Sequence, residues 1–163
     1  DKGTKVEQIY EATRLLKKHK IHVALFLQLG YLGETIDDIK LTLNMIEDLL
    51  PDDLGISVSY PLPGTVFYDK VKDQLKDKSN WKDSDDLDLM FKNNYSKEFY
   101  RLLQRYLHKR FRRKTSVQAI KDLFTNPTRK NFKNAISLLQ LFPTEQIAKY
   151  KLIGVEKSVK TIL

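Results

Sequence analysis

The sequence predicts an α/β fold in which βαβ units are followed by an α-helical extension. Two apolar runs, residues 23–29 and 54–60, have the composition of strands, and each ends at a short glycine-containing loop. Between them, apolar residues from Ile36 to Leu50 recur at the spacing of one helical stripe. From residue 96 onward the apolar spacing is helical throughout.

The first expected element is an amphipathic helix over residues 5–19, because apolar residues recur on one face of this segment. Thr4 and Glu7 have the spacing of a capping box at its start. The run 23–29 then predicts a strand buried on both faces, although its period alone is also compatible with a helix.

The loops that follow the two strands, at residues 30–35 (GYLGET) and 60–65 (YPLPGT), are the main candidates for a ligand site. A crossover helix makes the strands parallel, so both loops lie at the carboxyl edge of the sheet, where α/β folds bind ligands. Thr35 and Asp38 have capping spacing, and the helix amides behind them would receive a carboxylate or phosphate. The glycines either let a ligand approach the backbone or only provide the positive φ of a tight turn.

The rest of the chain predicts helices separated by breaks. A short helix covers residues 66–75, and the acids that follow it in residues 76–88 resemble a solvated helix start more than a calcium loop. In the extension, Ser116 has the position of a new helix cap, and Asn126-Pro127 and Phe142-Pro143 predict further breaks. The acids of residues 76–88 that resemble a solvated helix start are Asp83, Asp85, Asp86 and Asp88.

Composition limits the function classes. The chain is 41% apolar and 31% charged, and no apolar stretch approaches the roughly 20 residues of a membrane-spanning helix, so a cytoplasmic location is the default. Since the chain has no cysteine, disulfides, thiolate nucleophiles and cysteine-ligated iron-sulfur clusters are excluded for its own atoms. His19, His22 and His108 are too scattered to predict a metal site.

The charge is uneven along the chain. Residues 1–95 hold 13 Lys and Arg against 17 Asp and Glu, a net of −4, whereas residues 96–163 hold 16 against 4, a net of +12. A basic stripe on the helix at 96–114 is the electrostatic footprint of a nucleic-acid or anionic-ligand binding module, but it also fits a contact with a neighbouring domain or a solvated face. We expect nucleic-acid binding to be weak. The stripe consists of Arg101, Arg105, Lys109 and Arg112.

The strand-loop segments LFLQLGYLGET and ISVSYPLPGTVFYDKVK resemble the later βα units of radical S-adenosylmethionine (SAM) enzymes. The resemblance covers residues 1–90 and is closest to the cobalamin-dependent branch, the relatives of the anaerobic magnesium-protoporphyrin IX monomethyl ester oxidative cyclase. One departure is Leu32, which stands where the family usually has proline. The resemblance implies that residues 1–78 are the carboxyl-terminal part of a partial (β/α) TIM-like barrel and that residues 79–163 are a basic α-helical extension.

In that family a CxxxCxxC loop near the first strand binds a [4Fe-4S] cluster, which reductively cleaves SAM to a 5′-deoxyadenosyl radical. Because the chain begins at Asp1 and lacks the cysteine loop, the resemblance implies a carboxyl-terminal fragment that is inactive and cofactor-free alone. Its partner would be the missing amino-terminal half. The parent would be an oxidoreductase, a cyclase or methyltransferase, that acts on a small molecule with SAM, the cluster and, in this branch, cobalamin.

The resemblance also implies which residues contact SAM, while none is expected to be catalytic or to bind a metal. Gln28 and Gly30 would flank the adenine, Gly33 and Glu34 would fix the first loop, and the start of the second loop would line the other side. The implied cofactor-binding residues are Gln28, Gly30, Gly33, Glu34, Ser59, Tyr60 and Pro61.

A strand as apolar as 23–29 needs neighbours on its edges and faces, so we expect the isolated fragment to self-associate. The side chains expected near that contact, or under the carboxyl-terminal helices, are Val23, Leu25, Phe26, Leu27, Ile56 and Val58.

Overall fold

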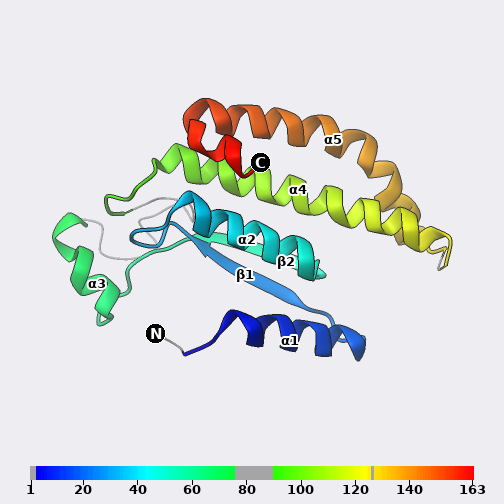
Figure 1. The fold of residues 1–163 in the computed structure, drawn as a ribbon, viewed down its shortest axis with the longest axis horizontal. Helices are drawn as coiled ribbons and strands as arrows, with labels where there is room; N and C mark the ends of the chain where they lie inside the picture. Colours follow the sequence, from blue (N-terminus) through cyan, green and yellow to red (C-terminus); the bar gives the residue numbers. More distant parts are fainter. Residues whose placement is uncertain (1–2, 76–89, 126) are drawn as a thin grey trace.

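A computed structural model describes residues 3–75, 90–125 and 127–163 (Figure 1). In Figure 1, α1 lies below a small sheet, α2 lies beside the sheet, and two long antiparallel helices lie above it. The elements are α1 (Val6–Lys18), β1 (Ala24–Leu29), α2 (Ile36–Leu49), β2 (Asp53–Val58), α3 (Val66–Val71), the 3-10 helix η1 (Lys72–Gln74), α4 (Lys97–Leu123), α5 (Arg129–Val155) and the 3-10 helix η3 (Lys157–Thr161).

The sheet confirms the predicted α/β unit. Strands β1 and β2 are parallel, in a register that runs from Ala24 opposite Asp53 to Leu29 opposite Val58, and α2 is the crossover helix. The predicted capping box of α2 is also present, because the Thr35 amide donates to the Asp38 carboxylate at 2.9 Å and the Asp38 amide donates to the Thr35 hydroxyl. Local sequence signals therefore determine where this helix begins.

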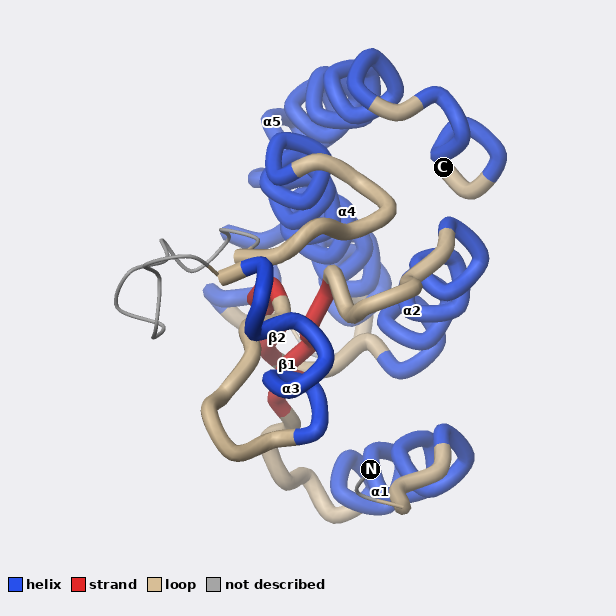
Figure 2. The backbone as a smooth tube through the Cα atoms, turned by 90° about the vertical axis from the view of Figure 1, so that its left-hand side faces the viewer, coloured by secondary structure: helices blue, strands red, loops and turns tan. Residues whose placement is uncertain are grey.

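Within the described residues, helices cover one face of the sheet and leave the other uncovered, which corrects the prediction that residues 23–29 are buried on both faces. Leu29 of β1 and Leu54, Ile56 and Val58 of β2 are buried, whereas Phe26 is 87% exposed. Figure 2 shows α1 and α2 together on one side of the strands. We call the other side, which carries Ala24, Phe26, Gln28, Gly55 and Ser57, the open face.

The structure also shows where the six side chains expected near a self-association contact lie. Val23, Ile56 and Val58 are buried within the chain, and Leu25 and Leu27 pack partly against the main core, so the fold itself covers these five. Phe26 is the exception, and its ring lies against the opposite strand. A Cβ atom placed on Gly55 would come within 2.7 Å of that ring, so the glycine makes room for it.

The two edges of the sheet differ. The Asp53 and Ser59 amides donate to Val23 and Leu29, so the backbone groups of the intervening β1 positions 24, 26 and 28 point to the outer edge. Within the described residues these groups have no hydrogen-bond partner. On the far edge, the Gln104 side chain of α4 donates to the Ile56 carbonyl at 3.2 Å. Helix α4 thus occupies the edge of β2 and leaves the edge of β1 open.

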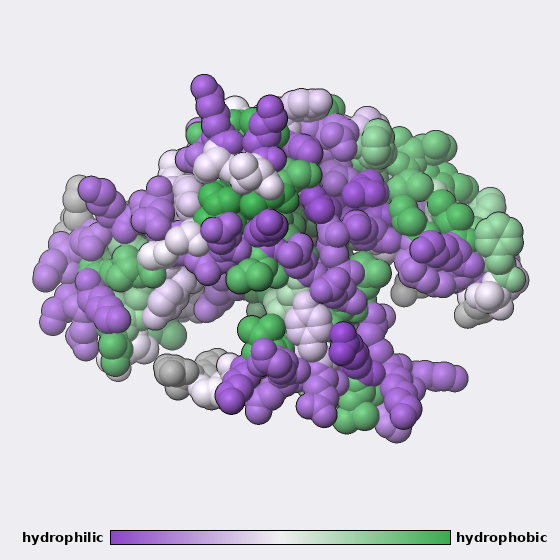
Figure 3. Space-filling model, viewed as in Figure 1, coloured by the Kyte–Doolittle hydropathy of each residue, from purple (hydrophilic) through white to green (hydrophobic). Residues whose placement is uncertain are grey.

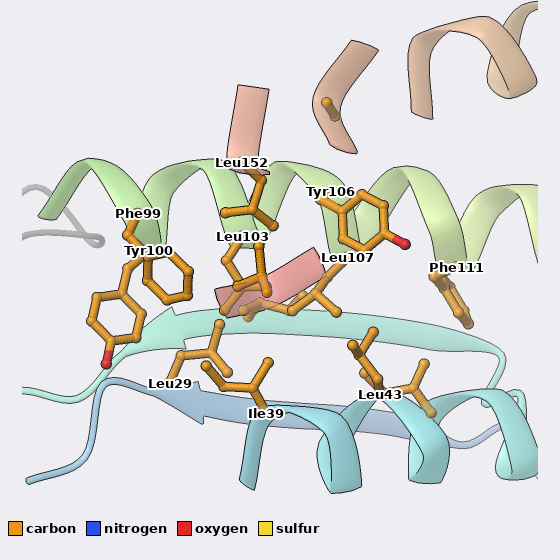
Figure 4. Close-up of a cluster of buried hydrophobic side chains, with 14 of the residues drawn as sticks. Leu29, Ile39, Leu43, Phe99, Tyr100, Leu103, Tyr106, Leu107, Phe111 and Leu152 are labelled. Atoms are coloured by element: carbon orange, nitrogen blue, oxygen red, sulfur yellow. The ribbon is translucent and has the colours of Figure 1, made fainter. Parts of the chain in front are cut away.

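The main core lies between the sheet, α2 and α4, and α5 closes it from above (Figure 4). Leu103 and Leu107 of α4 point toward the sheet, Tyr106 is buried in the same cluster, and Leu152 of α5 reaches it. The cluster therefore joins side chains from both sides of the predicted domain boundary, while residues 78 and 79 themselves lie outside the described ranges. None of the helices in the described ranges combines the length and apolar composition needed to cross a lipid bilayer.

Three predicted helix boundaries are wrong. Helix α1 is capped one residue later than expected, at Lys5, because the Gln8 side chain accepts from the Lys5 amide at 2.8 Å. Ser116 does not start a helix but lies buried inside α4, where its hydroxyl contacts that of Ser137 in α5 at 3.1 Å. Helix α5 continues through Pro143, which lies on its exposed side while α4 packs along the other.

Ion pairs connect α4 to its neighbours. Arg110 and Lys114 both pair with Glu47 of α2, the latter at 2.8 Å, and Arg113 pairs with Glu145 of α5. Burial alone would raise the pKa of Glu47, but the hydrogen bonds from Lys114 and Arg110 outweigh burial and lower it. The carboxylate is therefore held charged between two cations.

We predict that Glu145→Ala lowers the free energy of unfolding by about 3 kcal/mol, because it leaves the Arg113 guanidinium without its partner between two helices. The Glu145 side chain is only 4% exposed, whereas Arg113 at 24% retains some solvent, so the loss falls at the lower end for buried pairs. Urea denaturation measures it. The matched double variant, Arg113→Met with Glu145→Leu, should recover most of the loss, and a single-variant loss below about 1 kcal/mol would contradict the pairing.

Candidate functional site

The candidate site lies at the carboxyl edge of the sheet, where the two predicted loops leave β1 and β2. The Ser59 amide donates to the Leu29 carbonyl at 2.7 Å, and this bond holds the starts of both loops together. In Figure 2 this end faces the viewer, with α3 in front of the strands. The crossover topology thus gathers the loops at one edge, as the sequence predicts.

The first loop is a tight turn closed by its own side chain. Gly30 and Gly33 have φ values of 74° and 85°, which explains why the turn needs glycine at both positions. The Gly30 amide donates to the Glu34 carboxylate at 2.9 Å, and the Glu34 amide donates to the Tyr31 carbonyl at 3.0 Å. A Cβ atom at Gly33 would meet nothing within 4 Å, so the space beside this residue is open to a ligand.

Glu34 is the titratable group at the centre of the site. Burial raises the pKa of its carboxyl, and the hydrogen bond from the Gly30 amide offsets part of this rise. Burial also raises the pKa of the neighbouring Tyr100, and the charge of Glu34 adds to the rise. The Tyr100 hydroxyl has no hydrogen-bond partner within the described residues, so we treat its interaction with Glu34 as electrostatic.

Asn93 and Asn94 hold the first loop from outside, and sequence reasoning missed both. The Asn93 side chain donates to the Gly30 carbonyl at 2.6 Å, and the Asn94 side chain donates to the Glu34 carbonyl at 2.8 Å. Both contacts span about 60 residues of chain. No local pattern indicates such long-range contacts, and the only signal was a pair of adjacent amides between the acidic segment and α4.

An aromatic stack connects the two loops to the same segment. The Tyr31 and Phe67 rings stack at 4.8 Å, and Phe67 meets Phe91 edge-on at 5.2 Å. A second, smaller hydrophobic cluster lies beside them and is formed by Val71, Leu75, Met90 and Phe91, with Tyr60, Phe67 and Tyr68 packed against it. Aromatic and apolar side chains from three separate stretches of chain therefore pack together beside the two loops.

The predicted site residues divide into three groups. Gly30, Glu34 and Ser59 are brought together at the strand ends, and the buried Ser59 hydroxyl has no hydrogen-bond partner in the described part of the chain. Gln28 and Gly33 are exposed, Gln28 on the open face. The remaining two have structural positions, since Tyr60 packs against the second cluster and Pro61 is buried.

The amino end of α2 is less receptive to anions than the sequence suggests. The Asp38 carboxylate already accepts hydrogen bonds from the Thr35 hydroxyl and amide, and these bonds lower its pKa. Asp37 and the nearby Glu34 add further negative charge. A phosphate or carboxylate at this corner would therefore be repelled by three acidic side chains, which disfavours anion binding at the start of α2.

The remaining metal-binding candidates give no site. Within the described ranges no group of three or more His, Asp or Glu side chains could hold a metal ion. His19 and His22 are exposed, while His108 is half-buried and its pKa is lowered by burial and then by Arg112. The acids predicted to be a solvated helix start, Asp83, Asp85, Asp86 and Asp88, lie outside the described residues.

The predicted basic stripe lies along α4 as expected. Arg105 and Arg112 are exposed, and Arg101 and Lys109 are partly exposed. An open hollow of about 540 Å³ at the start of α4 is lined in part by Arg101 and Arg105. The other cations of residues 109–114, Arg110, Arg113 and Lys114, pair with acids of α2 and α5, so three of the five cations in this basic run are structural.

No protein-family model and no curated protein matches this chain.

We predict that Glu34→Gln becomes more stable relative to the wild type as the pH rises from about 4 to about 8. The raised pKa of Glu34 means that its ionisation opposes folding; this cost is absent below the unfolded value of 4.5 and is complete above the folded value. Glutamine retains an oxygen for the Gly30 amide. Chemical denaturation at several pH values measures the difference, and a difference that does not change with pH would contradict the assignment.

The matched control is Glu34→Leu, which removes the acceptor as well as the charge. It should lose about 1–3 kcal/mol at every pH, because the buried Gly30 amide is left without a partner.

Proposed function

We propose that this chain is the carboxyl-terminal part of a radical SAM enzyme and contributes one wall of the SAM site to a [4Fe-4S]-dependent radical reaction of the cyclase or methyltransferase type. The observation that carries the proposal is the asymmetry of the sheet. The outer edge of β1 and the open face are uncovered by described residues, while α4 occupies the edge of β2.

A barrel explains this asymmetry. In a (β/α) barrel each strand packs its outer face on helices, points its inner face to the lumen and pairs with a neighbour on each edge. Here α2 and α4 pack on the outer face, with α1 beside α2, and the open face with Gln28 and Ser57 has the position of the lumen. The edge of β1 would pair with the preceding strand, supplied by an amino-terminal half, and β2 would be the last strand of a partial barrel.

The residues at the loops fit part of a SAM site. Gln28 offers an amide on the open face, next to the strand ends where Gly30 turns the chain. The buried Ser59 hydroxyl is unpartnered within the described residues, and the space beside Gly33 is open. These groups would hold the adenine and ribose, and Glu34 would keep the loop closed around them. SAM, when bound, supplies the radical after its reductive cleavage.

The other cofactors of the family do not fit the residues of this chain. A [4Fe-4S] cluster needs thiolate ligands, and the chain has no cysteine. The ligands of the cluster, and any cobalamin site, would belong to the amino-terminal half. The role assigned to this chain is therefore to bind and orient SAM and a small-molecule substrate.

The test begins with the sequence upstream of Asp1, where we expect a CxxxCxxC motif. In that longer protein, reconstituted anaerobically, Gly33→Val should weaken SAM binding by about tenfold or more, because its side chain fills the space of the ligand. Titration calorimetry measures the affinity, and Mössbauer spectroscopy verifies that the cluster is intact.

The matched control is Gly64→Val. Gly64 has a φ of 83° and open space around its Cβ position, so valine there imposes a similar backbone strain to that at Gly33, at a position that is not among the proposed SAM contacts. Equal losses of affinity in the two variants would show a structural effect alone. The absence of a cysteine motif upstream would overturn the assignment to this enzyme class.

The alternative function is binding of nucleic acid or another anionic ligand by the basic stripe of α4. The observation that favours it is that Arg105 and Arg112 are exposed and that Arg105 lines the open hollow at the start of this helix. The structural use of Arg110, Arg113 and Lys114 argues against high affinity, because these cations are already paired.

For this alternative we predict only weak, sequence-independent binding to duplex DNA. The logarithm of affinity should fall with the logarithm of salt concentration by about 0.9 for each phosphate contacted. Arg105→Gln with Arg112→Gln should reduce that slope by about 2, whereas Lys40→Gln, an exposed charge on α2, should leave it unchanged. Fluorescence anisotropy measures both. Tight binding at physiological salt that depends on the two arginines would favour the binding module over the enzyme fragment.

A further inference from the structure

The outward side of α5 is apolar, although no described residue covers it. The opposite side of this helix packs on α4, so a surface helix of this kind would normally be polar on its outward side. Instead, six large apolar side chains are between 54% and 80% exposed. We call them the outer face of α5, and they are Phe132, Ile136, Leu139, Phe142, Ile147 and Tyr150.

The outer face forms one long stripe. Positions 132, 136, 139, 147 and 150 recur at helical spacing, with Phe142 beside Leu139, and a helix of 27 residues is about 40 Å long. Figure 3 shows apolar surface gathered over the right-hand part of the molecule, where α4 and α5 meet. Beside the stripe lies a hollow of about 350 Å³ with mostly apolar lining, from Val117, Leu138, Leu139, Phe142 and Pro143 with Arg113. A continuous apolar surface of this length marks an interaction site.

The charges of α5 select the partner. Arg129, Lys133 and Lys151 are exposed, whereas Lys149, on the other flank of the stripe, is half-buried and donates to the Leu163 carbonyl at 2.9 Å. The one acid of the helix, Glu145, is buried and paired with Arg113, so every described charge that α5 presents to solvent is positive. The chain from residue 96 to 163 carries a net charge of +12.

A second copy of the chain is a poor partner, because two such helices would bring their cations together. A partner with negative charge is required. The stripe stands on the outermost helix of the fold, with exposed cations along one flank and aromatic residues within it. Helices with this arrangement lie in the plane of a lipid interface, their apolar face among the acyl chains and their cations at the headgroups.

We propose that the outer face of α5 binds an anionic lipid surface, with the helix axis parallel to the membrane plane. Phe132, Ile136, Leu139 and Ile147 enter the acyl-chain region, and the hollow beside Leu139 and Phe142 receives part of one chain. Lys133 and Lys151 contact headgroup phosphates on one flank. This binding does not depend on the function proposed for the loops.

The experiment is vesicle flotation of the full chain. We expect binding to vesicles of phosphatidylcholine mixed equally with phosphatidylglycerol, and much less to phosphatidylcholine alone. Ile136→Gln with Leu139→Gln should lower the partition coefficient by about tenfold or more, because two exposed apolar anchors are lost. Lys133→Gln with Lys151→Gln should lower it several-fold, and this loss should be largest at low salt. Circular dichroism verifies that each variant is folded.

The matched control is Phe26→Gln, which removes an apolar side chain that is 87% exposed but lies on the sheet. It should leave vesicle binding unchanged. Three results would overturn the proposal: no vesicle binding by the wild type, binding that the Ile136 and Leu139 substitutions leave intact, or a dimer in sedimentation that these substitutions abolish. Binding to an acidic amphipathic peptide without binding to vesicles would also overturn it, in favour of a protein partner.

Discussion

The contact of α4 with the sheet is the interaction on which the rest of the structure depends. Two parallel strands with a single crossover helix bury too little apolar surface to be stable alone. Helix α4 supplies the missing side of the core through Leu103, Tyr106 and Leu107, and its Gln104 binds the exposed carbonyl of β2. Its cations then fix α2 and α5 in place. The sheet, the loops at its carboxyl edge and α5 are all positioned by this one helix.

The local parts of the fold were predictable because their signals are local. The stripe of α2, its capping box and the glycine turns depend on residues a few positions apart, and the structure has them where the sequence places them. The errors occur where tertiary packing decides. Ser116 has the character of a cap but is held inside α4 by contact with α5, and Pro143 is tolerated because its side of the helix faces away from α4.

Burial and charge were predictable only in part, for the same reason. The apolar run of β1 does not reveal whether one face or two are covered, so the exposure of Phe26 could not be inferred from it. In the basic run, helical spacing distributes cations around α4, and the positions of Glu47 and Glu145 on other helices determine which of them become structural. Asn93 and Asn94 were missed because they act over about 60 residues of chain.

The unequal edges of the sheet also limit how copies of this chain can aggregate. A fibril grows when every added molecule exposes a new strand edge for the next one. Among the described residues, Gln104 and α4 occupy the edge of β2, and the edge of β1 is the one left open to another strand. Two molecules that pair through β1 would each use the one edge that the described residues leave open, and growth would end at the pair. The occupied edge of β2 therefore prevents the addition of further molecules that amyloid-like assembly requires.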